Sequence, residues 1–189
     1  MPTLFPEIPW YWYLVSQVGA IFAIWIYGSF AEWCLHRFIM HSKFIPRFPF
    51  EKHALIHHKL FRGDESFTAS TDEQMHHVSF NWYDHVTLNL IHLGLFAGLE
   101  YVTGLPILIG CMIGVASYLI AYESIHYIFH VPGNRFFEKH RWFEWLREHH
   151  QIHHKQHFRN LNVVLPLADF VLGTRRSPSV LVDSESTSA

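Results

Sequence analysis

The stretch WYWYLVSQVGAIFAIWIYGSFA, Trp10 to Ala31, decides the fold class because it runs for about twenty residues without a formal charge. An α-helix of this length can cross the hydrocarbon core of a bilayer. The stretch begins with four aromatic residues, and Trp and Tyr favour the membrane–water interface. We therefore predict a transmembrane helix over these residues.

A second apolar region extends from Val86 to Tyr122 and is broken near Thr103 to Pro106. Gly and Pro at such a break favour a turn, so the region predicts two helices that form a transmembrane hairpin. Glu100 lies close to this turn, where its carboxylate can reach the lipid headgroups. Together the apolar stretches predict an all-α, integral-membrane bundle with about three or four apolar helices.

The positions of the basic residues predict an orientation. Six of the fourteen Lys and Arg lie between Arg37 and Arg62, eight lie between Arg135 and Arg176, and none precedes the first apolar helix or lies in the hairpin turn. All fourteen therefore fall on one side of a three-helix arrangement. The positive-inside rule makes that side cytoplasmic.

The overall composition limits the other classes. The formal charge of -2 gives no electrostatic basis for binding nucleic acid. Residues 1–176 are expected to form a single membrane domain. Residues 177–189 are rich in Ser, Asp and Glu, so we expect a disordered C-terminal tail.

Histidine is over-represented, with 17 copies, and ten of these fall into four spaced motifs. The motifs are HRFIMH (His36, His41), HALIHH (His53, His57, His58), HYIFH (His126, His130) and HQIHH (His150, His153, His154). They follow or flank the apolar helices on the side that holds all fourteen Lys and Arg, so we expect these histidines to face the cytoplasm.

Helical geometry predicts how these side chains group, because residues three or four apart share a face of an α-helix. His126 is expected to face one cavity with His130, and His53 to do so with His57. His150, His153 and His154 are likewise expected to face one cavity. His36 and His41 are five apart and diverge on an ideal α-helix, which leaves either a frayed helix end or ligation of different metals.

Imidazole is a ligand that suits zinc, iron, copper and nickel. Ten imidazoles are too many for one ion, so the motifs predict two metals with four or five ligands each. A dimetal centre beside apolar helices is within reach of a lipid chain, and oxygen chemistry there needs a redox metal, with iron the expected one. A non-catalytic membrane zinc carrier or sensor is the alternative from a different class.

The ordered spacings HX4H, HX3HH, HX3H and HX2HH around a hydrophobic hairpin resemble the signature of the fatty acid hydroxylase and sterol desaturase superfamily. The segment NVVLPLADFVLGT near the C-terminus, with Asp169 before Gly173 and Thr174, resembles the ending of that family. The resemblance covers Glu32 to Thr174. It implies a helical membrane fold with a cytosolic, histidine-rich helical cap. It also implies an oxidoreductase with two iron ions, zinc being a possible substitute, that uses O2 to hydroxylate an unactivated C–H bond of a lipid.

The resemblance further implies that the ten motif histidines are the metal ligands. Lipid desaturation and carotenoid hydroxylation use the same scaffold and remain alternatives. The chain has no room for a fused cytochrome b5 domain, so a separate ferredoxin or cytochrome b5 type donor is expected to supply electrons. Residues expected to hydrogen-bond the ligands or to flank them are Glu32, Glu123, His149 and His157.

Overall fold

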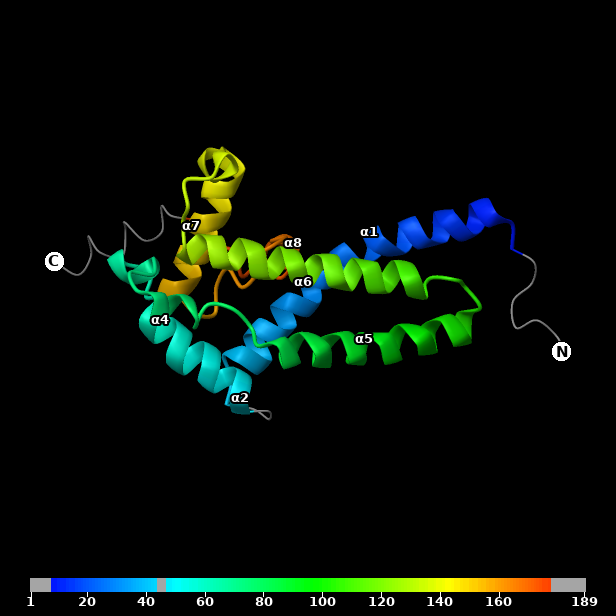
Figure 1. The fold of residues 1–189 in the computed structure, drawn as a ribbon, viewed down its shortest axis with the longest axis horizontal. Coiled ribbons are helices and arrows are strands. Elements are labelled where there is room, and N and C mark those ends of the chain that lie inside the picture. Colours follow the sequence, from blue (N-terminus) through cyan, green and yellow to red (C-terminus); the bar gives the residue numbers. More distant parts are fainter. Residues whose placement is uncertain (1–7, 44–46, 178–189) are drawn as a thin grey trace. The chain divides into compact units, whose positions relative to one another are not determined.

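A computed structural model describes residues 8–43 and 47–177 (Figure 1). Within these ranges all regular structure is helical and no strand occurs, so the predicted all-α class is confirmed. The chain divides into two compact units, Met1–Gly28 with Phe80–Ala121 and Ser29–Ser79 with Tyr122–Ala189. Residues 178–189, most of the predicted disordered tail, lie outside the described residues.

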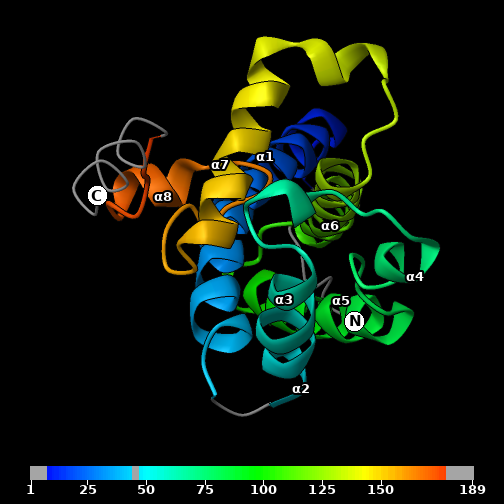
Figure 2. The ribbon, with the colours of Figure 1, turned by 90° about the vertical axis from the view of Figure 1, so that its left-hand side faces the viewer.

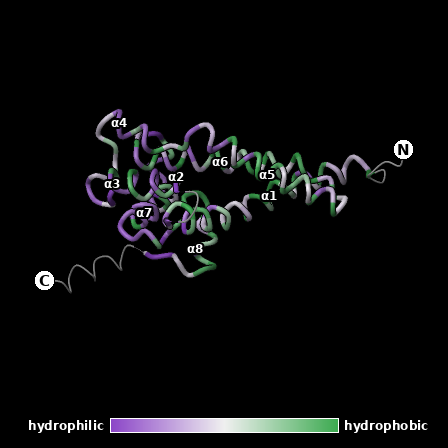
Figure 3. Tube along the Cα trace, turned by 90° about the horizontal axis from the view of Figure 1, so that it is seen from below, coloured by the Kyte–Doolittle hydropathy of each residue, from purple (hydrophilic) through white to green (hydrophobic). Residues whose placement is uncertain are grey.

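Three of the described helices are long and apolar enough to cross a membrane. They are α1 (Trp10–Cys34), which continues as the π-helix η1 (Leu35–Met40), α5 (Trp82–Thr103) and α6 (Leu108–His130). Figure 3 shows hydrophobic residues along all three, and much of this apolar surface is exposed, as expected of a membrane protein. The helices extend beyond the predicted stretches: α1 continues past Ala31 to Cys34, and α5 begins at Trp82 and not at Val86.

In the first unit, α1 packs against α6, where Gly110 and Gly114 of α6 lie directly against Gln17 and Ile24 of α1. Ala20 and Ile24 of α1 form a buried cluster with Cys111 and Val115 of α6 and with Phe96 of α5. Small residues at such contacts let helix backbones approach closely, which favours association where lipid removes the usual hydrophobic driving force.

Polar contacts add to this packing between α1 and α6. Gln17 accepts a hydrogen bond from the Gly110 N–H and donates one to the Pro106 carbonyl, and the Trp25 indole donates to Ser117 Oγ at 3.1 Å. These polar groups satisfy one another inside an apolar region, where an unpaired group would be costly.

The hairpin turn between α5 and α6 depends on Gly104 and Glu100. Gly104 has a φ of 68°, a left-handed conformation that glycine adopts without strain, and its N–H bonds the Glu100 carbonyl at 2.8 Å. The Glu100 carboxylate accepts from the N–H groups of Ile107 at 2.8 Å and Leu108 at 2.6 Å. Glu100 therefore satisfies free donors at the start of α6.

The second unit is built from short helices. Along the chain they are α2 (Arg47–Phe50), the π-helix η2 (Glu51–His57), α3 (His58–Leu60), the 3₁₀ helix η3 (Glu65–Phe67), α4 (Asp72–Met75), the 3₁₀ helix η4 (Phe136–Lys139), α7 (Arg141–Lys155) and α8 (Leu167–Val171). Figure 2 shows α8 beside α7, where the rings of Trp145 and Phe170 stack with centroids 6.3 Å apart. The inward face of α7 carries four buried histidines.

The contact between α1 and α6 gives a first prediction. A Cβ at Gly110 would lie 2.3 Å from the Gln17 carbonyl oxygen, which is backbone and cannot move aside. We expect Gly110→Ala to lower stability by about 1–3 kcal/mol, the usual range for overpacking, measured as a lower thermal midpoint in detergent.

Gly98→Ala is the matched control for this substitution. Gly98 also lies in an apolar helix, and a Cβ there meets nothing within 4 Å. Equal midpoints for the Gly110 and Gly98 variants would contradict the described packing of α1 on α6.

Candidate metal centre

The ten motif histidines gather into two groups of five in the second unit, and all ten are buried. In each group one ring nitrogen per residue lies within 4.8 Å of the others, so each group could hold a metal ion. The first histidine group is His36, His41, His53, His58 and His153; the second histidine group is His57, His126, His130, His150 and His154.

Two π-helical turns explain the grouping of the first two motifs. The His41 N–H bonds the His36 carbonyl at 3.1 Å, and the His58 N–H bonds the His53 carbonyl, so both bonds span five residues. Residues five apart lie on nearly one face of a π-helix. His36 therefore joins His41, and His53 joins His58, in the first histidine group.

Two α-helical expectations are corrected by this geometry. His53 does not share a group with His57, because η2 is π-helical and turns His57 toward the second histidine group. In α7, His150 and His154 are four apart and share the second histidine group, whereas His153 enters the first. Each of the adjacent pairs, His57–His58 and His153–His154, thus supplies both groups.

The spacing of the ring nitrogens fits metal ligation. In the first histidine group, Nε2 of His53 lies 2.8 Å from that of His36 and 3.0 Å from that of His58. In the second, Nε2 of His150 lies 3.3 Å from that of His130 and 3.0 Å from that of His154. Nitrogens bound to one ion at about 2.1 Å lie about 3 Å apart when they occupy neighbouring positions.

Backbone carbonyls select which ring nitrogen faces inward. Nδ1 of His130 lies 2.7 Å from the Phe67 carbonyl, and Nδ1 of His153 lies 2.9 Å from the Arg159 carbonyl. A carbonyl can only accept, so Nδ1 carries the proton and Nε2 presents a lone pair to the group. His36, His57 and His154 make the same kind of contact with the carbonyls of Leu161, His77 and Phe61.

Several buried ring nitrogens then need a partner. Nε2 of His57 and of His126 in the second histidine group has no hydrogen-bond partner. His57 Nδ1 already faces the His77 carbonyl, so its Nε2 is a buried lone pair. An unpaired buried polar group is costly, and a cation would satisfy several such lone pairs at once. The donor set therefore fits a metal ion in each group.

Aromatic side chains separate the second histidine group from water. Phe61 is fully buried, and its ring lies 5.0 Å from that of His57 and 4.5 Å from that of His130. The turn after it is fixed by Gly63, which has a φ of 56° and lies against Lys155 and the Gln151 carbonyl, leaving no room for a side chain. This turn holds the carbonyls of Phe61 and Phe67 toward the ligands.

Burial keeps the ligands in the form that binds metal. It lowers the pKa well below 6.5 for His53, His57, His58, His150, His153 and His154, and neighbouring imidazoles lower it further. A neutral imidazole has the lone pair that a metal needs. These ligands therefore require no deprotonation at neutral pH.

The four predicted flanking residues occupy different environments. His149 is buried and bonds Asp169 at 3.0 Å, and Glu32 accepts from the Val163 N–H and from the Asn162 amide, so each contacts the segment after α7. His157 is exposed, and its ring lies 4.5 Å from that of His58 and 5.4 Å from that of His41. Glu123 is half-buried in α6, and its role stays a prediction.

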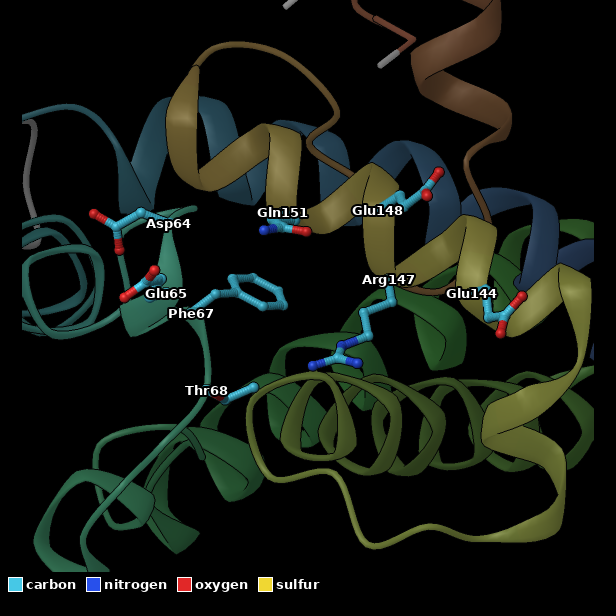
Figure 4. A pocket seen from close by; sticks show the side chains of 8 residues that line it. All are labelled: Asp64, Glu65, Phe67, Thr68, Glu144, Arg147, Glu148 and Gln151. Atoms are coloured by element: carbon cyan, nitrogen blue, oxygen red, sulfur yellow. The ribbon is translucent and has the colours of Figure 1, made fainter.

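A polar surface pocket lies beside the second histidine group, but no histidine of either group lines it (Figure 4). Phe67 separates the pocket from the second histidine group. Its ring lies 4.6 Å from the His130 ring on one side and 5.9 Å from the Arg147 guanidinium in the pocket. The pocket is lined by Asp64, Glu65, Phe67, Thr68, Glu144, Arg147, Glu148 and Gln151. Four carboxylates make this lining unsuitable for an acyl chain.

Comparisons of the chain with protein-family profiles, curated proteins and solved structures return no match. The carbonyl contacts that orient the ligands had no signal in the sequence, because a backbone carbonyl has no side-chain signature.

The two groups predict separable metal losses. We expect His153→Ala to remove the metal of the first histidine group and His57→Ala that of the second, so that each variant retains about half of the wild-type metal on elemental analysis. His92→Ala is the control, because His92 lies in the first unit and bonds Tyr27 instead. Full metal content in both ligand variants would contradict the assignment.

The depressed pKa values predict how stability depends on pH. A histidine whose pKa is lowered in the folded state binds fewer protons than in the unfolded chain, where its pKa is about 6.5. Its contribution is therefore complete above that pH and is lost as the pH falls below it. We expect the thermal midpoint of the metal-stripped protein to decrease as the pH is lowered from about 7.5 to about 5.5.

The metal-loaded protein is the control for this titration. Its midpoint should change less over the same interval, because a bound ion holds the ligand nitrogens against protonation. A metal-stripped midpoint that is constant or rises toward pH 5.5 would rule out buried neutral ligands.

Proposed function

We propose that the protein is a membrane-bound di-iron oxygenase that hydroxylates an unactivated C–H bond of a lipid, using O2 and electrons from a separate donor. The observation that carries this proposal is the pair of adjacent five-histidine groups. When bound there, two iron ions would supply a redox centre able to activate dioxygen.

The donor set supports iron over a structural zinc site. Structural zinc is almost always four-coordinate and tetrahedral, often with cysteine ligands. Here each group offers five imidazoles, and neither group contains a cysteine. Five nitrogens around a six-coordinate ion leave one position for a small ligand such as dioxygen or water.

The placement of the ligands along the chain supports a lipid substrate. His36 lies within the apolar segment Trp10–Met40, and His126 and His130 end the apolar helix α6. Metals held there would lie at the ends of the apolar segments, within reach of an acyl chain or a sterol-like ring. All fourteen Lys and Arg flank the same ends, which supports a cytoplasmic position for the site.

The chain's own residues perform three tasks in this reaction. Backbone carbonyls hold the imidazole ligands in place through Nδ1. Phe61 and Phe67 exclude water, and the apolar helices admit the lipid. Hydroxylation balances as one C–H bond, O2, two electrons and two protons giving an alcohol and one water. The electrons would come from a ferredoxin or cytochrome b5 type protein.

Product analysis with ¹⁸O2 tests the proposal. The protein is expressed in cells with and without the His57→Ala substitution, and the lipids are compared by mass spectrometry. We expect a lipid alcohol that carries one ¹⁸O atom and is lost in the variant. An unlabelled product that is lighter by two hydrogens would contradict hydroxylation and identify the reaction as desaturation.

A zinc carrier or sensor makes the opposite prediction. Purified protein that retains zinc, consumes no oxygen with any reductant and moves zinc across vesicles would overturn the oxygenase proposal. The same preparations supply the controls, since the His57→Ala variant should lose whichever activity depends on the second histidine group.

A further inference from the structure

The segment after α7 carries the carbonyls that orient the first histidine group. The Arg159 carbonyl accepts from Nδ1 of His153, and the Leu161 carbonyl accepts from Nδ1 of His36. Both histidines belong to the first group. The corresponding carbonyls for the second histidine group come from Phe61, Phe67 and His77, far from this segment in sequence.

The Asp169 carboxylate anchors this segment at Leu161 and Asn162. Asp169 is fully buried, and its Oδ1 accepts from the Leu161 N–H at 3.0 Å and from the Thr174 hydroxyl at 2.6 Å. Its Oδ2 accepts from the Asn162 N–H at 2.8 Å and from His149 Nε2 at 3.0 Å. Four donors thus fill about four acceptor positions of one carboxylate.

The carboxylate is ionised despite its burial. Burial alone raises the pKa of Asp169, but hydrogen bonds from His149, Thr174 and the Asn162 N–H outweigh it and hold the pKa below its ordinary value. Hydrogen bonds to a charged group are stronger than those between neutral groups. The segment is therefore bound to a fixed charge.

Other contacts lock the bend from which the two carbonyls project. Asn160 has a φ of 51°, a left-handed conformation that asparagine tolerates, and its side chain bonds the carbonyls of His149 and Arg176 and the Arg176 N–H. Glu32 accepts from the next N–H along, that of Val163. Three successive N–H groups, at positions 161 to 163, therefore bond buried carboxylates.

We propose that Asp169 is a positioning residue for the metal site of the first histidine group and not for that of the second. It acts through the Leu161 peptide, whose N–H it binds and whose carbonyl holds His36. The segment NVVLPLADFVLGT would thus complete one of the two metal sites. This inference rests on the metal centre and requires neither iron nor the proposed lipid reaction.

Asp169→Asn is the sharpest substitution, because it keeps the shape of the side chain and replaces one acceptor oxygen by an NH2 group. That group would face two donors, either those at Oδ1 or those at Oδ2. The segment would have to move, and Leu161 and its carbonyl with it.

The test separates the two sites by disabling one at a time in the full-length protein in detergent. Removing His57 and His126, each replaced by Ala, leaves the first histidine group; removing His41 and His53 leaves the second. Zn²⁺ affinity is measured by competition with a chromogenic chelator. We expect Asp169→Asn to weaken binding about 10–100-fold in the first background, the usual loss when a residue supporting a ligand is changed.

In the second background we expect a change of less than about twofold. Equal losses in both backgrounds, or no loss in the first, would overturn the proposal. The readout uses zinc alone, so an absent lipid product would count against the oxygenase and leave this inference standing.

Two further variants guard against general destabilisation. Ser29→Ala removes the hydrogen bond that Ser29 donates to the Leu165 carbonyl and the one that it accepts from the Ala168 N–H. Both groups lie further along the chain and do not hold the orienting carbonyls of Arg159 and Leu161. It should leave Zn²⁺ affinity unchanged in both backgrounds, and a loss equal to that of Asp169→Asn would contradict the proposal.

Thr174→Val keeps the shape of the side chain but removes one donor to Asp169 and the acceptor of the Trp33 indole N–H, and Thr174→Ser restores both hydrogen bonds. Weaker Zn²⁺ binding in the Val variant, recovered in the Ser variant and confined to the first histidine group, supports the proposal even where Asp169→Asn fails to fold. Unchanged binding in the Val variant would contradict it.

Discussion

The second unit depends on imidazole nitrogens that face one another across about 3 Å, and on five inward Nε2 atoms that the carbonyl contacts of Nδ1 leave as lone pairs. Nε2 atoms of the first histidine group approach to 2.8 Å, and those of the second to 3.0 Å. Lone pairs gathered within one group repel, and burial has removed the water that would otherwise donate to them. A cation in each group turns this repulsion into attraction, so folding of this unit and metal binding are one problem.

The backbone solves the geometric part of that problem in two ways. Where two ligands of the same group are spaced by five residues the helix is a π-helix, in η1 and η2, and where they are spaced by four it is an α-helix, in α6 and α7. Carbonyls from loops then fix the outward nitrogen of five ligands, which leaves the inward nitrogen as an acceptor. The loops around η3 and after α7 are therefore part of the site.

Much of this arrangement follows from composition and spacing. The uncharged stretch from Trp10 predicts the first apolar helix, and the ten motif histidines are the ten that the structure brings together. Their division between two groups was not predictable by α-helical geometry, because a π-turn depends on tertiary context and not on local propensity. The sequence also marks Asp169 only by resemblance, since its four hydrogen bonds join residues that are distant from it or in loops.

The most direct test of two adjacent five-histidine metal sites is X-ray absorption at the metal edge of the loaded, purified protein. Two ions per chain, each with about five nitrogen neighbours near 2.1 Å and strong imidazole scattering, are the result expected from this donor set. One ion per chain, or a first shell that contains sulfur or mainly carboxylate oxygen, would contradict it.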